Sequence, residues 1–145
     1  MQEPFFKATL PFLPPGINHS YRIIRIGRSH TLAASTDLKD FKDQSTKFLL
    51  LHQYSTDWAV VQAISASKQK IPLSAQLCFY FPTLWKRDLD GGEKHLVDVV
   101  FEFFKSCGHK INDTCIVDKH SHKFADRANP RCEISLRVYE GDISW

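Results

Sequence analysis

Residues 131–139, RCEISLRVY, carry the clearest structural signal in the sequence. Polar and apolar residues alternate there, and the apolar set is Cys132, Ile134, Leu136 and Val138. Period-two alternation predicts a strand with one face on the core and one in water. The stretch 74–81, SAQLCFYF, alternates in the same way until Pro82 ends it. Together the two stretches predict a sheet with one wet face.

Helical periodicity appears outside these strands. Residues 93–105 place a buried stripe on one side of a helix, made of Leu96, Val97, Val100, Phe103 and Phe104, and turn Lys94, Asp98, Glu102 and Lys105 outward. We also expect helices at 37–52 and 58–67, strands at 5–10 and 21–26, a loop at 27–36, and a strand that starts at Cys115. The sum predicts an α+β fold, with a mostly antiparallel sheet and helices packed on one face, in a single domain spanning 1–145.

Composition limits the classes of function. The 145 residues suit one domain, and a net charge of +3 permits a polyanionic partner without requiring one. The four cysteines form no C-x-x-C pair, which favours buried thiols in a reducing compartment. No apolar run is long enough for a membrane span, and the N-terminus lacks the pattern of a signal peptide. We therefore expect a soluble cytoplasmic protein with no membrane partner.

The segment 86–94, KRDLDGGEK, is the most informative for chemistry. Asp88 and Asp90 are two residues apart, so in an extended chain both carboxylates point to one side. A hard divalent cation would relieve their repulsion. Gly91-Gly92 would let backbone approach a ligand, and Lys94, about one helical turn on, could bind a phosphate.

Plain structural explanations compete with this interpretation. A D-x-D pair is common by chance, and Asp90 with Glu93 also matches a helix cap. Lys94 and Asp98 have the spacing of a surface ion pair. The residues alone therefore indicate a metal site as one of several possibilities.

The ordered set of motifs resembles the RusA family of Holliday-junction resolvases. Members show a basic residue before D-x-D, a lysine in the helix that follows, and a further aspartate after it. Arg87, Asp88, Asp90, Lys94 and Asp113 match these positions in turn. The opening TLPFLPPGINHSYR and the closing NPRCEISL also resemble the family's first and last strands.

The resemblance implies a homodimer that binds four-way junctions and makes paired, symmetric nicks with Mg²⁺ or Mn²⁺. Asp88, Asp90 and Asp113 would hold the metal, and Lys94 would complete the catalytic set. Gly91 replaces the family's usual Asn, and the segment before Asp113 is longer than is typical, which makes Asp118 a rival third acid. A nuclease for other branched DNA and a non-catalytic junction-binding protein are the alternatives.

A basic run beside the acids offers candidate phosphate contacts. Lys119, Lys123 and Arg127 in this run, together with Lys86 and Arg87, are the predicted DNA-binding residues. The alternative is an edge strand guarded by lysine. His120 and His122 have the spacing of zinc ligands, but no cysteine lies close in sequence.

Overall fold

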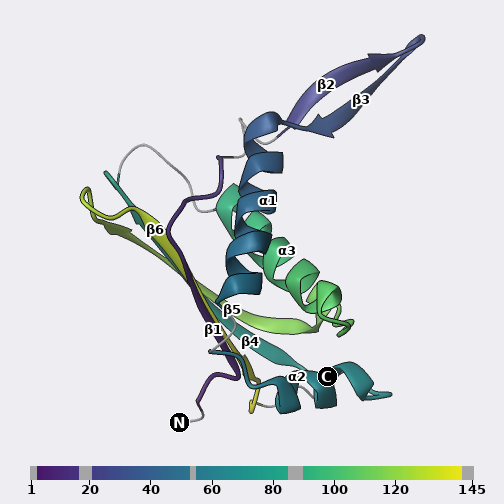
Figure 1. Cartoon of the computed structure of the whole chain (residues 1–145), viewed down its shortest axis with the longest axis vertical. Coiled ribbons are helices and arrows are strands. Elements are labelled where there is room, and N and C mark those ends of the chain that lie inside the picture. Colours follow the sequence, from purple (N-terminus) through teal and green to yellow (C-terminus); the bar gives the residue numbers. More distant parts are fainter. Residues whose placement is uncertain (1–2, 17–20, 53–54, 85–89, 142–145) are drawn as a thin grey trace.

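The computed structural model describes residues 3–16, 21–52, 55–84 and 90–141. Figure 1 shows helices and strands gathered into an α+β arrangement, as the sequence predicts. In chain order the elements are β1 (Phe6–Leu10), β2 (Tyr21–Ile26), β3 (Ser29–Ala34), α1 (Thr36–Leu51), α2 (Trp58–Ala66), β4 (Leu73–Phe81), α3 (Asp90–Ser106), the 3₁₀ turn η2 (Asp113–Cys115), β5 (Ile116–Ala125) and β6 (Arg131–Val138).

The main sheet has four strands in the order β1-β6-β4-β5. The β1–β6 and β6–β4 pairs are antiparallel, which confirms the mostly antiparallel prediction, whereas β4 and β5 are parallel. The parallel pair has a simple cause: α3 lies between β4 and β5 in the chain and carries it back to the same end of the sheet. The sheet is therefore mixed.

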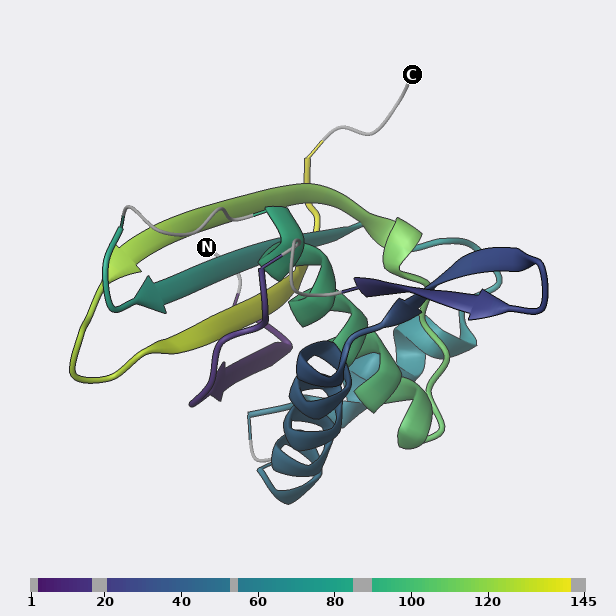
Figure 2. The ribbon, with the colours of Figure 1, turned by 90° about the horizontal axis from the view of Figure 1, so that it is seen from above.

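One face of this sheet is covered by helices and the other is open (Figure 2). Leu73, Ala75, Leu77, Phe79 and Phe81 of β4 are buried on the covered side, which we call the helix face. The alternate residues of β4 and their neighbours lie on what we call the open face. Burying a large apolar side chain contributes roughly 1.5–3 kcal/mol, so this alternation specifies which face the helices cover.

Helix α3 is the most deeply buried helix. The predicted stripe is buried, and so are His95, Val99 and Phe101 on other sides of the helix. Helix α1 packs beside α3, and its Leu38, Phe41 and Leu49 are buried. It begins where Ser35 accepts a hydrogen bond from the Leu38 N–H at 3.2 Å, which satisfies one of the unpaired donors of its first turn.

The expected loop at 27–36 is wrong, because residues 29–34 form β3. Ile26 pairs with Ser29, so Gly27 and Arg28 form a two-residue turn, and Gly27 adopts a φ of 62°. A left-handed residue is what tight hairpin turns require, and glycine adopts it without strain. β2 and β3 form a separate two-stranded sheet that projects beyond α1 (Figure 1).

No helix within the described residues is both long enough and apolar enough to cross a lipid bilayer.

Candidate active site

A cleft of about 250 Å³ opens between the first half of α3 and the segment that enters β5. It brings together residues from three elements that lie far apart in the sequence. Its walls hold two basic and three acidic side chains among apolar ones. The lining residues are Glu93, Lys94, Val97, Asp98, Asp113, Ile116 and Lys119.

Helix α3 supplies one wall through residues one turn apart. Lys94 is exposed and Asp98 is half-buried, and their i,i+4 spacing places them on the same side of the helix. Burial raises the pKa of Asp98, and the negative charges of Asp113 and Glu102 raise it further. The positive charges of Lys42 and Lys94 oppose the rise. Asp98 is thus a carboxylate that lies within reach of charges on α1, α3 and η2.

Asp113 comes from the facing wall, where it begins the 3₁₀ turn η2. The side chain of Asn112 accepts a hydrogen bond from the Thr114 N–H at 2.9 Å, and Cys115 is buried at the end of the turn. This hydrogen bond and the burial of Cys115 hold the turn. Asp113 itself is exposed to the cleft. The chain therefore presents Asp113 to α3 from a separate, anchored segment.

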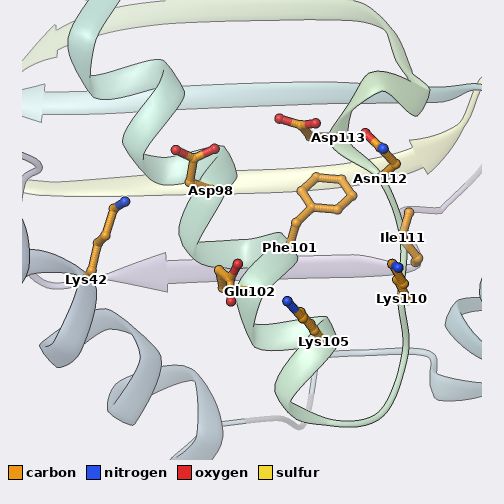
Figure 3. Close-up of a pocket in the computed structure, with 9 residues that line it drawn as sticks. All are labelled: Lys42, Asp98, Phe101, Glu102, Lys105, Lys110, Ile111, Asn112 and Asp113. Carbon is orange, nitrogen blue, oxygen red and sulfur yellow. The ribbon is translucent and has the colours of Figure 1, made fainter.

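A second cleft, of about 440 Å³, continues along α3 from these acids. Asp98 and Asp113 line both clefts, so the two adjoin at the carboxylates. Figure 3 shows Lys42 reaching from α1 toward Asp98, with Asp113 across the opening. The remaining lining residues are Phe101, Glu102, Lys105, Lys110, Ile111 and Asn112.

The D-x-D segment stands at the border of the described residues. Lys86, Arg87 and Asp88 lie outside them, and for Asp90 the structure describes only the backbone, as the first residue of α3. The carboxylate of Glu93, the other half of the suggested capping box, pairs instead with Lys119 at 2.8 Å.

Gly92 has a packing role that the sequence interpretation did not include. A Cβ at this position would lie 3.2 Å from both the Phe79 ring and the Pro14 ring. Real Cβ contacts are rarely so short, so the missing side chain lets the start of α3 sit close to β4.

The rival third acid, Asp118, lies on the opposite side of the sheet. It is paired with Ser74 of β4 and accepts a hydrogen bond from the Ser74 hydroxyl at 2.8 Å. Its other carboxylate oxygen is 3.1 Å from the His120 ring. Both partners belong to the open face, whereas Asp113 lines the cleft on the helix face. Of the two, the geometry brings only Asp113 to Lys94.

The predicted basic run is divided between the two faces of β5. Lys119 and Lys123 pair with Ala75 and Phe79, whose side chains are on the helix face. His120 and His122 pair with Gln76 and Cys78 on the open face. The run is therefore not one continuous basic surface. Of the predicted DNA-binding residues, Lys119 lines the cleft; Arg127 is exposed in the turn that follows β5.

Three residues of this region were not predicted from the sequence to belong to the site. Asp98 was expected to face outward as a surface partner of Lys94, although its spacing of eight from Asp90 placed it on the same side of the helix. His95 is fully buried beside Lys94, and burial with the charges of Lys42 and Lys94 lowers its pKa. Lys42 had no local signal at all, because only the packing of α1 on α3 brings it here.

The described residues contain no group of three or more histidine, cysteine or acidic side chains arranged to hold a metal ion. The side chains of Asp88 and Asp90, two of the three predicted ligands, lie outside the described residues. Asp113 and the neighbouring Asp98 supply carboxylate oxygens, which are the donors that Mg²⁺ and Mn²⁺ prefer. These donors fit a hard divalent cation.

Comparison with protein-family models gives no match, and comparison with the curated proteins gives none either. The resemblance to the RusA family remains a prediction from the motifs.

Proposed function

We propose that this chain is a divalent-metal-dependent endonuclease that acts on branched DNA, with the four-way junction as its main substrate. The observation that carries the proposal is the shared cleft of Lys94 and Asp113. Lys94 and Asp113 are distant in sequence and lie on different elements, α3 and η2. They line one cleft, beside the helix that begins at the D-x-D segment. The order of the motifs, which resembles that of the RusA resolvases, supports the same activity.

Asp88, Asp90 and Asp113 would hold the metal, Mg²⁺ with Mn²⁺ as a substitute. When bound, such an ion polarises a phosphoryl oxygen and makes a bound water more acidic. Asp98 lines the same cleft as Asp113 and lies on the same side of α3 as Lys94. Its charge would add to the field that retains a cation in the cleft.

Lys94 would bind the scissile phosphate and offset the negative charge that develops during its hydrolysis. Its position supports this role, since it is exposed and lines the cleft. Asp98, one turn along, would hold the ammonium group toward the cleft. Lys94 would therefore stabilise charge rather than remove a proton.

The adjoining cleft suggests where the DNA backbone would run. Lys42, Lys105 and Lys110 line it, next to the carboxylates. A metal ion would neutralise the acids, so the lysines would then present net positive charge to phosphates. Lys119 would contribute at the other end, with Lys86, Arg87, Lys123 and Arg127 as the further predicted contacts. Such contacts orient DNA without reading its sequence.

A C2 homodimer would place equivalent sites on equivalent strands, as paired nicks require. We place the protein in the cytoplasm, where thiols stay reduced, since Cys78, Cys107, Cys115 and Cys132 are all free.

The test is cleavage of matched four-way, forked and linear duplex DNAs, each with Mg²⁺ and with EDTA. We expect paired nicks in the four-way junction with Mg²⁺ and none with EDTA. Cleavage of forks at an equal rate would favour a nuclease of broader specificity. Tight junction binding without nicks, in either Mg²⁺ or Mn²⁺, would contradict the proposed activity and favour a non-catalytic binding protein.

A further inference from the structure

The two edge strands of the main sheet, β1 and β5, differ in what lies beside them. At the β1 edge, residues 55–57 run alongside the strand: the Lys7 N–H donates to the Ser55 carbonyl at 3.3 Å, and the Asp57 N–H donates to the Phe5 carbonyl at 2.7 Å. At the other edge, β5 pairs only with β4 among the strands that the structure describes. β5 is also twice as long, with ten residues against five.

An open edge strand exposes backbone donors and acceptors that can pair with another strand. β5 carries two of the four exposed large apolar side chains among the described residues, Val117 at 48% exposed and Phe124 at 42%. Lysine often protects such an edge. Lys119, however, extends over the helix face to Glu93, where the two form an ion pair at 2.8 Å.

We infer that β5 is the dimer interface, and that it pairs in antiparallel fashion with β5 of a second copy of this chain, centred on His120. The two-fold axis would be perpendicular to the sheet. Eight strands would then form one continuous sheet across the two copies, since each contributes four. The inference deepens the proposed function because it names the surface that makes the C2 dimer, but its test needs neither DNA nor metal.

Charge selects the register. Around a perpendicular axis, residues that face each other across the interface share a side of the sheet. Centring on His120 places Asp118 opposite the partner's His122, twice, with both on the open face. If the axis passed through Lys119, Lys119 would face the partner's Lys119. If the axis passed through Ser121, Lys119 would face the partner's Lys123. Like charges directly opposite are unfavourable, so the two neighbouring registers are disfavoured.

The same register places Phe124 at the level of the partner's residues 116–117 at both ends of the interface. A bulge interrupts the alternation of β5 there, and the exposed Val117 belongs to it. Phe124 is already stacked on Tyr80, at 5.0 Å between ring centroids, and therefore offers a fixed apolar surface. Both copies of the cleft would open on the helix face of the joined sheet, so that one DNA molecule could reach them.

The experiment uses position 120, because a residue on the two-fold axis faces its own copy. Cα atoms of directly opposed residues are about 4.5–5.5 Å apart, within the range of a disulfide. In a Cys78→Ser background, His120→Cys should form a disulfide-linked dimer under mild oxidation. The matched control is Gln76→Cys, which is exposed on the same face but lies one strand away from the edge. It should stay monomeric on a non-reducing gel.

Sedimentation equilibrium adds a measurement without cross-linking. His120→Lys places two ammonium groups across the axis and should weaken the dimer about tenfold or more. Gln76→Lys should leave the dimer unchanged, and so should Leu51→Lys, which alters the exposed apolar end of α1. A wild-type chain that sediments as a monomer would overturn the inference. The inference would also be overturned if the wild-type chain forms a dimer that His120→Cys does not cross-link and His120→Lys does not weaken. The interface would then lie on another surface.

Discussion

Replacing Lys94 by alanine should leave the fold intact and slow the chemical step. Lys94 is exposed, and its side chain lines the cleft that also holds Asp98 and Asp113. Removing one preorganised charge-stabilising group costs about 10²- to 10³-fold in rate, or about 2.7–4 kcal/mol of activation free energy. We expect a decrease of that order in the single-turnover rate of nicking at saturating protein.

The effect on stability should be far smaller. An i,i+4 pairing with Asp98 would contribute about 0.2–0.5 kcal/mol, and alanine recovers a few tenths through its higher helix propensity. The free energy of unfolding should therefore change by less than about 0.5 kcal/mol. Lys94→Arg keeps the charge but changes its shape, so we expect partial recovery of the rate.

Lys105→Ala is the matched control, since Lys105 is an exposed lysine on the same helix that lines only the adjoining cleft. It should raise the Kd for junction DNA and reduce the salt dependence of binding, with no change in the saturated rate. A wild-type rate for Lys94→Ala would refute the catalytic role and leave Lys94 as a surface partner of Asp98. Equal rate losses in both variants would assign the effect to binding.

Three further predictions concern the residues around the cleft. The pKa of His95 is lowered by burial and by Lys42 and Lys94. As the pH falls, the unfolded chain therefore takes up a proton at this residue before the folded chain does. The free energy of unfolding, measured with urea, should therefore drop as the pH falls through the ordinary histidine pKa of about 6.5, and the drop should shrink in His95→Gln; an equal slope in both proteins would contradict this. Burial raises the pKa of Asp98, so its ionised form costs stability at neutral pH, and Asp98→Asn should raise the Tm of the metal-free protein while slowing nicking. A lower Tm for that variant would count against the burial argument. Gly92→Val should cost about 1–3 kcal/mol in thermal unfolding because its side chain meets Phe79 and Pro14 within 3.2 Å. Gly16→Val, where nothing lies within 4 Å of the added Cβ, should not share this effect.

Most of the fold could be predicted from the sequence because apolar periodicity reports which side of an element is buried. The alternation in β4 and β6 and the stripe of α3 all appear where they were expected. β3 was missed because SHTLAA has no alternation, and its pairing depends on the turn at Gly27. The parallel pairing of β4 with β5 depends on the path of α3, which periodicity does not report.

The candidate site was less predictable, for a physical reason. Lys94 and Asp113 could be named because the motif order marks them. The contribution of Lys42 depends on how α1 packs beside α3, and the partial burial of Asp98 depends on the segment that faces it. The division of the basic run between two faces follows from strand alternation. It could have been predicted once 116–125 was taken as one long strand.

The most direct test of the central claim, that the cleft on the helix face holds the nuclease site, compares Asp113→Asn with Asp118→Asn. Both change a carboxylate to an amide of the same size, five residues apart in sequence, on opposite faces of the sheet. The measurement is the single-turnover rate of nicking of a four-way junction with Mg²⁺, at protein concentrations that saturate binding. We expect Asp113→Asn to abolish nicking while junction binding persists. Asp118 belongs to the inferred dimer interface and not to the cleft, so Asp118→Asn should cut at close to the wild-type rate at protein concentrations that keep it dimeric. Wild-type cleavage by Asp113→Asn, with loss of cleavage in Asp118→Asn, would contradict the account and place the site on the open face.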